Sequence, residues 1–290
     1  MGNFRIITDS TTDLTPALIE ELGVQVVPLC YMMGGRTYHN IPGGGEMDEP
    51  AFYNKLRGGA VSTTTQINSE EFLQVFTPLL EAGEDVLYIA FSSGLSGTCQ
   101  SAFLAREELK KRFPERRLEV FDSLCASMGE GLLVYHAAKL CQEGKSLDEV
   151  LAWLKENVLR LCHWFTVDDL NHLKRGGRVS TATAVVGTIL GIKPVLHVDN
   201  EGHLIPVSKV RGRKQSLDAL VKRMEETVED PANQMIFISH GDCLEDAQYV
   251  EQQIREKLGV QQVIIGYIGP VIGAHSGPGT VALFFLGRER

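Results

Sequence analysis

The sequence lacks the short motifs that identify the commonest metal, nucleotide and catalytic sites. Its six cysteines include no CxxC pair and no zinc-ligand spacing, so we expect reduced thiols and no metal site. The glycines at 43–45 are followed by Glu46, which excludes a Walker A loop there. The turn at Ser96 reads G-x-S-G-T, so it also lacks the α/β-hydrolase nucleophile motif, G-x-S-x-G.

Positive charge and a targeting segment are lacking as well. The chain has 28 Lys and Arg against 37 Asp and Glu, and this net charge of -9 argues against a general nucleic-acid binder. The start of the chain shows no apolar signal-peptide segment, so we expect a cytoplasmic protein. The uncharged stretch from Val260 to Gly287 is interrupted by prolines, glycines and His275. We interpret it as two buried strands joined by a Gly-rich loop, and expect no stable membrane insertion.

A length of 290 residues is sufficient for two domains, and we place their boundary near residue 160, giving domains 1–160 and 161–290. In the first domain, apolar runs of strand length alternate with amphipathic helical windows. This pattern is typical of an α/β domain whose mainly parallel sheet is flanked by helices. In the second domain, Val195 to Val210 predicts a hairpin that turns at Asn200-Glu201-Gly202.

Several individual elements have specific signals in the sequence. Thr15-Pro16 predicts the N-cap and first residue of a helix. The segment from Val24 to Met33 predicts one strand, and Ser69 is the predicted N-cap of a helix over residues 70–80. A continuous apolar run from Asp85 to Phe91 predicts a strand at the centre of a sheet that is covered on both faces.

Three hydroxyl-rich segments follow or lie between the predicted strands of the first domain: Thr8 to Thr12, Ser62 to Thr65 and Ser92 to Thr98. Ligands of open α/β sheets bind outside the carboxyl ends of the strands, so we expect these segments to converge around a small anion. Thr98 would lie near a helix N-terminus, where the dipole favours negative charge. The alternative is that each segment serves only as a turn or a helix cap.

Two further segments are candidates for binding. Lys174, Arg175 and Arg178 flank two glycines and form a basic cluster that either binds an anion or acidic partner, or is a solvated helix end. His275 is the only titratable residue of a long uncharged run, where it is either a ligand contact or a hydrogen-bonded loop histidine.

These segments together resemble the DegV family of bacterial fatty-acid-binding proteins, and the resemblance covers essentially the whole chain. The motifs that carry it are Thr8 to Leu14, Thr64-Thr65-Gln66, Ser92 to Thr98, His172 to Arg178, Leu190 to Leu196 and Gly273 to Gly279. The resemblance implies a two-domain DegV-type fold in which the C-terminal α/β domain has a mixed sheet. It also implies that a long-chain fatty acid such as palmitate lies between the two domains.

The resemblance implies that Thr64 and Ser96 bind the carboxylate of the acid, with Ser93 and His275 as further candidates from the same motifs. The departures from the family pattern are Thr65 and Ile67, where serine and proline are usual. Without that proline the loop backbone is less restricted, which affects where the Thr64 hydroxyl lies.

The function that the resemblance implies is that of a carrier with no catalytic residue and no cofactor apart from the bound acid. Such a carrier presents the acid to an ATP-using fatty acid kinase, which forms an acyl phosphate for phospholipid synthesis. Arg175, Arg178 and His275 would then lie where phosphate approaches or where the kinase docks. The alternatives are a serine esterase or acyl-transfer enzyme that uses Ser93 or Ser96 with His275, and a small-anion sensor that binds no lipid.

Overall fold

The structure, a computed structural model, describes residues 4–180 and 191–290. Its helices and strands are β1 (Phe4–Asp9), η1 (Ser10–Thr12), α1 (Pro16–Leu22), β2 (Gln25–Val27), β3 (Cys30–Met33), β4 (Arg36–His39), α2 (Glu49–Arg57), β5 (Ser62–Thr65), α3 (Ser69–Glu81), β6 (Asp85–Ala90), α4 (Thr98–Arg112), β7 (Leu118–Asp122), α5 (Met128–Gln142), α6 (Leu147–Asn157), η2 (Val158–Arg160), β8 (Leu161–Thr166), α7 (Asn171–Arg175), β9 (Ile192–Val198), β10 (Leu204–Arg211), α9 (Arg213–Thr227), β11 (Met235–His240), α10 (Leu244–Leu258), β12 (Gln262–Tyr267), α11 (Pro270–Ser276) and β13 (Val281–Leu286).

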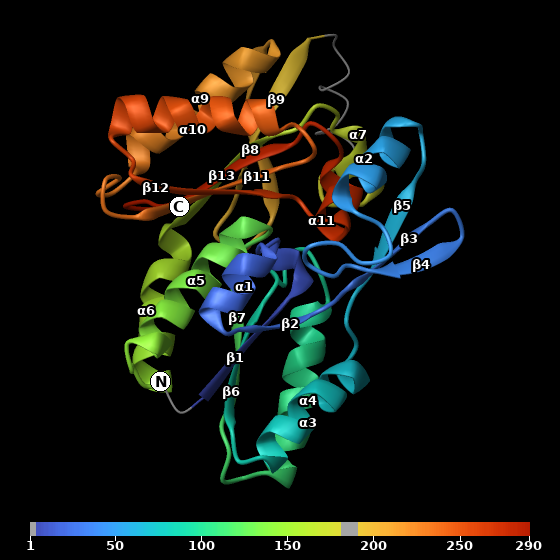
Figure 1. Cartoon of the computed structure of the whole chain (residues 1–290), viewed down its shortest axis with the longest axis vertical. Helices are drawn as coiled ribbons and strands as arrows, with labels where there is room; N and C mark the ends of the chain where they lie inside the picture. Colours follow the sequence, from blue (N-terminus) through green and yellow to red (C-terminus); the bar gives the residue numbers. More distant parts are fainter. Residues whose placement is uncertain (1–3, 181–190) are drawn as a thin grey trace.

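The first sheet is parallel and has the strand order β2-β1-β6-β7 (Figure 1). Successive side chains of a strand point to opposite faces, so Leu87 and Ile89 pack with α1, α5 and α6. Val86 and Tyr88 pack with α3 and α4 on the other face. A sheet covered in this way has apolar residues on both faces, and this confirms both the predicted α/β class and the central strand predicted from the continuous apolar run.

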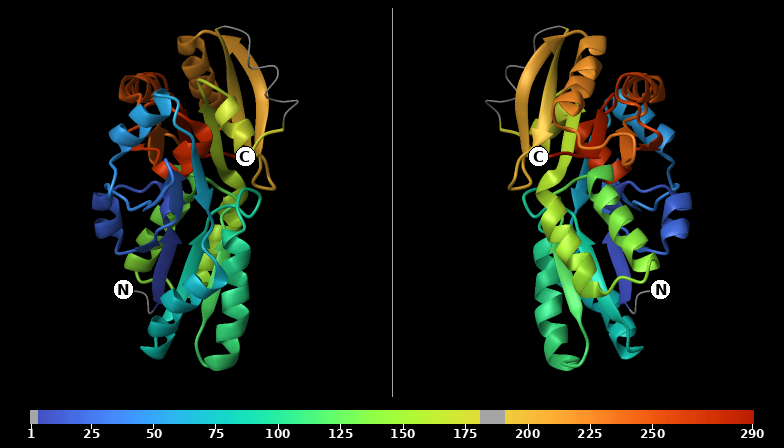
Figure 2. Two further views of the ribbon diagram at one scale, coloured as in Figure 1. Left: turned by 90° about the vertical axis from the view of Figure 1, so that its right-hand side faces the viewer. Right: turned by 90° about the vertical axis from the view of Figure 1, so that its left-hand side faces the viewer.

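The second sheet is mixed and has the strand order β10-β9-β8-β13-β11-β12. Only β11 and β12 run parallel within it. Its outer face is covered by α9 and α10, and its inner face packs on α5 through Phe165, Phe237 and Phe284 (Figures 1 and 2). The predicted hairpin is present as β9 and β10, which pair antiparallel. The expected mixed sheet of the C-terminal half is confirmed.

The segment from Val24 to Met33 is two strands and not the single strand predicted. β2 belongs to the parallel sheet, whereas β3 is the middle strand of a three-stranded antiparallel sheet with the order β4-β3-β5. Pro28 separates the two strands because it has no amide hydrogen for a sheet, and the next amide, Leu29 N, donates to Ser10 Oγ at 2.9 Å. Ser62 to Thr65, one of the hydroxyl-rich segments, is itself strand β5.

The predicted start of α1 is confirmed, and the predicted N-cap of α3 is wrong by one residue. Thr15 caps α1 by accepting from Leu18 N, and Pro16 is the first helical residue, as predicted. For α3 the N-cap is Asn68 and not Ser69, because Asn68 and Glu71 form a capping box. The predicted loop between the two terminal strands contains the short helix α11. Those strands are not adjacent, since β11 lies between β12 and β13.

Within the described residues, no strand before residue 123 pairs with a strand after residue 160. The two halves are joined by α5, which contacts β6 of the parallel sheet and β8, β11 and β13 of the mixed sheet. The boundary at residue 160 remains our interpretation. No helix among the described residues is long and apolar enough to cross a membrane.

A buried pair of carboxyl groups lies beneath the first hydroxyl-rich segment. Asp9 and Glu130 are both fully buried, and burial raises the pKa of each. Asp9 accepts hydrogen bonds from Thr11 N at 3.0 Å and Tyr88 OH at 2.6 Å, as an ionised group would. Among the described residues, Glu130 forms hydrogen bonds only with threonine hydroxyls: Thr8 Oγ1 at 3.2 Å and Thr11 Oγ1 at 2.8 Å.

Counting hydrogens shows that this pair holds at least one proton, because Thr11 has a single hydroxyl hydrogen for both Asp9 Oδ1 at 2.5 Å and Glu130 Oε2 at 2.8 Å. Thr8 Oγ1 also lies 2.9 Å from Ile89 O, which can only accept, so the single hydroxyl hydrogen of Thr8 is used there. The contact between Thr8 Oγ1 and Glu130 Oε1 then requires a hydrogen on Glu130. Asp9 accepts from two backbone amides and a tyrosine hydroxyl, whereas Glu130 has no such donor among the described residues, so we infer that Glu130 is a neutral acid and Asp9 a carboxylate.

This assignment predicts that Glu130→Gln stabilises the protein at neutral and higher pH. The raised pKa of Glu130 means that the unfolded state ionises first. Wild-type stability therefore falls relative to the variant as pH rises above about 4.3, by at most about 1.4 kcal/mol per pH unit. Urea unfolding between pH 4 and 9 measures this, with exposed Glu20→Gln as the control. A Glu130→Gln protein less stable than wild type at pH 8 would contradict the assignment.

Candidate functional site

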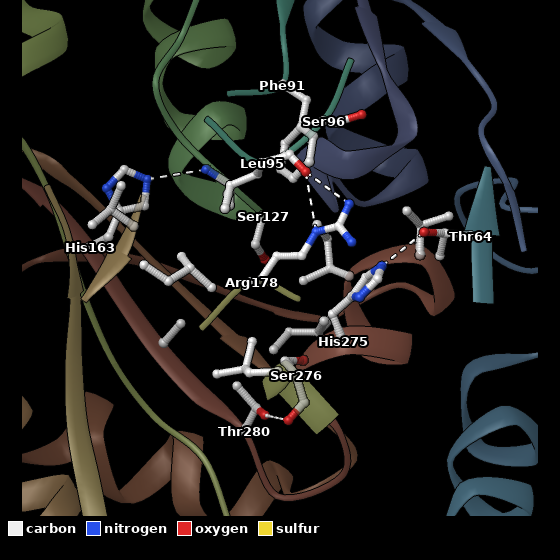
Figure 3. Close-up of a pocket in the computed structure, with 18 of the residues that line it drawn as sticks. Thr64, Phe91, Leu95, Ser96, Ser127, His163, Arg178, His275, Ser276 and Thr280 are labelled. Atoms are coloured by element: carbon white, nitrogen blue, oxygen red, sulfur yellow. Dashed lines mark hydrogen bonds between the residues drawn. The ribbon is translucent and has the colours of Figure 1, made fainter. Parts of the chain in front are cut away.

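A cavity of about 320 Å³ lies between the loops at the carboxyl ends of the parallel sheet and the inner face of the mixed sheet (Figure 3). Its size falls within the range of small-molecule pockets, about 300–1,000 Å³. Most of the wall is apolar, including Phe91 after β6, Phe165 on β8, Phe284 on β13 and Leu204 on β10. Because the wall draws on both halves of the chain, the cavity forms only when they are packed together.

One end of the cavity is polar, and two predicted site residues meet there. Thr64 Oγ1 of β5 lies 2.8 Å from His275 Nε2 of α11, although the two residues are 211 positions apart (Figure 3). The β5 strand pairs with β3, and α11 follows β12, so two separate sheets position this pair. The expectation that residues from these distant motifs share one site is therefore met by Thr64 and His275.

Glycines allow the chain to approach closely around this polar end. A Cβ atom at Gly176 would lie 2.1 Å from His275 Nδ1, and one at Gly97 would lie 2.2 Å from Gln66 Oε1. The α7 segment therefore packs directly on His275, and the turn after Ser96 packs directly on the segment that contains Thr64. Neither glycine has a positive φ, so the constraint is steric, and it is stricter at Gly176, which faces the His275 ring, than at Gly97, which faces the flexible end of Gln66.

Arg178 completes the polar end. Its Nε and Nη2 donate to Leu95 O at 3.2 and 2.9 Å, and its Nη1 donates to Gly176 O. Among the described residues that line the cavity, Arg178 is the only one with a formal charge, and no Asp or Glu side chain lines it. Burial lowers the pKa of Arg178, which shows that its charge is held at a desolvation cost. A cation without an acidic partner makes this end suited to an anion.

His275 is neutral at physiological pH. Burial, with a contribution from the Arg178 charge, lowers its pKa to about 4. Its buried Nδ1 atom has no hydrogen-bond partner among the described residues, and the adjacent cation favours a bare lone pair there. We therefore assign the ring hydrogen to Nε2, which donates to Thr64 Oγ1. The hydroxyl hydrogen of Thr64 is then available to a ligand.

The two candidate serines lie in different surroundings. Ser96 is half-buried and lines the cavity, and its Oγ accepts from Thr98 N at 3.2 Å and lies 3.0 Å from Thr98 Oγ1. Thr98 is the first residue of α4, as the sequence predicted. Ser93 is exposed, does not line the cavity, and its backbone amide donates to Asp122. The structure therefore groups Ser96, and not Ser93, with Thr64 and His275.

Only two of the three hydroxyl-rich segments reach the cavity. Residues 62–65 and 92–98 contribute to its wall, but no residue from Thr8 to Thr12 does. The hydroxyls of Thr8 and Thr11 are directed at the buried carboxyl groups of Asp9 and Glu130 instead. Two of the three segments, and not all three as expected, therefore meet at the cavity.

Sequence analysis missed part of the site. Arg178 was expected where phosphate or a partner approaches, and the structure places it in the cavity wall, whereas Arg175 is exposed on α7. The three phenylalanines of the wall were interpreted only as parts of strands. Strand alternation separates Phe165 from Trp164, but which face encloses a cavity depends on the packing of the two sheets. Leu190, part of one family motif, lies outside the described residues.

Comparison with known proteins establishes the family. A family model described as "Uncharacterised protein, DegV family" matches residues 3–288. The chain belongs to the DegV family. A DegV domain-containing protein of Clostridium perfringens is 45% identical to it over 291 residues, with 100% of this chain and 99% of that protein covered.

Two solved structures are similar over the whole length. A DegV lipid binding protein from Thermotoga maritima is 30% identical, with a TM-score of 0.87 and 100% of both chains covered. A DegV family protein from Thermus thermophilus, whose structure is described as showing fatty acid binding, is 33% identical, with a TM-score of 0.89 and coverage of 98% and 99%.

The steric role of Gly176 is testable. We expect Gly176→Ala to displace His275, because its Cβ would overlap Nδ1, and to destabilise the protein by about 1–3 kcal/mol, as overpacking does. Gly45→Ala is the matched control, since its Cβ would make only ordinary contacts at 3.5 Å or more. Thermal unfolding compares the two variants, and equal stability would show that the contact at His275 is not a constraint.

Proposed function

We propose that the protein binds a long-chain fatty acid of about the length of palmitate and holds its carboxylate at Thr64 and Ser96, with His275 orienting the Thr64 hydroxyl. The observation that carries this proposal is an apolar cavity whose one charged wall residue among those described is Arg178. Such a cavity matches an amphiphile with one negative head group and an apolar tail. The similarity to the lipid-binding and fatty-acid-binding relatives from Thermotoga maritima and Thermus thermophilus supports it.

The polar end supplies chemistry suited to a carboxylate. His275 Nε2 donates its hydrogen to Thr64 Oγ1. The hydroxyl hydrogen of Thr64 is therefore free to bond one oxygen of the carboxylate. Ser96 offers a second hydroxyl, and the Arg178 charge strengthens both hydrogen bonds in a medium of low dielectric constant. Ser93 is left out of the proposal because it is exposed outside the cavity.

The magnitudes indicate which part of the ligand dominates affinity. Burying about 14 methylenes at about 0.8 kcal/mol each contributes around 11 kcal/mol before the cost of immobilisation. A hydrogen bond to a charged group contributes about 1.5–3 kcal/mol. The tail therefore sets affinity, and the head group sets orientation.

The geometry supports a carrier over the alternative of a serine esterase or acyl-transfer enzyme. A nucleophilic serine needs a histidine base within hydrogen-bonding distance, and the base needs an orienting group. His275 Nε2 bonds to Thr64, and Ser96 Oγ bonds to Thr98. No described carboxylate bonds to His275 Nδ1. We therefore propose a non-catalytic role in fatty acid metabolism.

We further propose that the carrier presents the bound acid to an ATP-dependent fatty acid kinase in the cytoplasm, which forms an acyl phosphate for phospholipid synthesis. Two features support this. Arg178 lies beside the proposed carboxylate position, where incoming phosphate would be neutralised. Arg175, three residues earlier, is exposed on α7 and can contact a partner there without contacting the acid.

The proposed binding mode predicts a strong dependence on chain length. Octanoate should bind at least a hundredfold more weakly than palmitate because it loses about eight buried methylenes. Thr64→Ala or Ser96→Ala should weaken palmitate binding by about 10- to 160-fold, less than the loss of about 6 kcal/mol expected for eight methylenes. Isothermal titration calorimetry measures both effects, and native mass spectrometry of the purified protein identifies any bound acid. Equal affinity for octanoate and palmitate would contradict the proposal.

The proposed partner contact predicts that Arg175→Glu abolishes kinase-dependent phosphorylation of the bound acid. Palmitate affinity should stay within about twofold of wild type, since Arg175 does not line the cavity. The measurement is acyl phosphate formation with ATP and the kinase, and the control is Arg112→Glu, another exposed arginine at a helix end. Loss of both palmitate binding and phosphorylation in Arg175→Glu would reject the separate roles.

A further inference from the structure

Ser276, the last residue of α11, has an unusual hydroxyl. Its side chain lines the cavity, and only 6% of the residue is exposed. Its Oγ atom is buried and has no hydrogen-bond partner among the described residues. A buried hydroxyl without a partner costs free energy, so native proteins rarely retain one.

The neighbouring polar groups do not relieve Ser276. Thr280 Oγ1 lies 3.0 Å from Ser276 O and 2.9 Å from Gly277 O, so its hydrogen is used by backbone carbonyls. Ser127, also in the cavity wall, donates from Oγ to Asp13 Oδ2 at 2.5 Å. The hydroxyls of Thr280 and Ser127 thus have hydrogen-bond partners, whereas that of Ser276 has none among the described residues.

Ser276 also lies apart from the proposed carboxylate contacts. Successive residues of a helix point about 100° apart, so Ser276 and His275 are directed at different parts of the cavity. Figure 3 shows His275 directed toward Thr64, with Ser276 away from that pair. Ala282 and Phe284 of β13 are part of the same wall, so a ligand group near Ser276 is in largely apolar surroundings.

We propose that Ser276 is a second polar contact for the ligand and that the cavity takes a long-chain acid bearing a hydroxyl group on its chain. The inference rests on the proposed fatty-acid function and specifies its ligand. A chain hydroxyl both donates and accepts, so it pairs with the serine hydroxyl and removes the cost of burying either one alone. A site with an unpaired polar group discriminates against a ligand that lacks the matching group.

The test compares palmitate with a set of monohydroxypalmitates that carry the hydroxyl at different carbons. Affinities are measured by calorimetry for wild type, Ser276→Ala and Ser96→Ala. We expect at least one positional isomer to bind wild type about two- to tenfold more tightly than it binds Ser276→Ala. Palmitate itself should bind Ser276→Ala at least as tightly as wild type. Ser96→Ala, the control in the carboxylate site, should weaken all the acids by the same factor.

Two outcomes would overturn the inference. The first is that no isomer depends on Ser276. The second is that Ser276→Ala weakens palmitate and every isomer equally, which would place Ser276 among the carboxylate contacts. Ser276→Cys, which nearly keeps the side-chain volume but bonds weakly, repeats the test if the alanine variant does not fold. Failure of the proposed function itself is distinguishable, since wild type would then bind neither palmitate nor any isomer.

Discussion

The polar end of the cavity depends on the position of one helix of seven residues, α11. A helix this short is not stable alone, so its neighbours must fix it. At its start, Gly269 N donates to Asp13 Oδ1 at 2.9 Å, and Tyr53 OH donates to Ile268 O at 2.7 Å. At its end, Gly277 packs on the ring of His172. Both halves of the chain thus determine where His275 lies, and with it the contact to Thr64.

The second constraint is electrostatic. Arg178 is held by backbone carbonyls of two segments and by no carboxylate among the described residues, unlike Lys193, which pairs with Asp168 at 2.6 Å. Carbonyl dipoles orient the guanidinium without cancelling its charge. Burial, with a contribution from the same charge, lowers the pKa of His275 and keeps the imidazole neutral, so the cavity holds one positive charge and not two. An anionic ligand then compensates a desolvation cost that the protein itself leaves uncompensated.

The parts of the fold that were predictable from sequence are those with local causes. Thr15-Pro16 has a capping hydroxyl and a fixed φ in adjacent residues, and these two local features identified the start of α1. The cap of α3 was misplaced by one residue because Asn68 and Ser69 are both good caps. The choice between them depends on which one pairs with Glu71.

The parts that were not predictable depend on contacts between distant segments. Ser62 to Thr65 contains polar residues typical of a loop, and it is a strand because β3 supplies a pairing edge. α11 lies in a run rich in glycine and proline, where local preference opposes a helix, and tertiary contacts outweigh that preference. Family resemblance located Thr64, Ser96 and His275 in the sequence. Their mutual positions follow from the packing of the two halves.

The fate of the two hydroxyl-rich segments that follow β1 and β6 shows why composition alone could not identify the site. Both leave neighbouring strands of one sheet at its carboxyl edge. α5 places Glu130 beneath the first segment, and the hydroxyls of Thr8 and Thr11 turn inward to satisfy it. No described carboxylate contacts Ser96, which instead lies in the cavity wall near a cation. The first segment packs on the carboxyl group of Glu130, and the second lies in the cavity wall that contains the Arg178 cation. The charged group that tertiary packing places beside each segment therefore determines whether its hydroxyls are used within the protein or are available to a ligand.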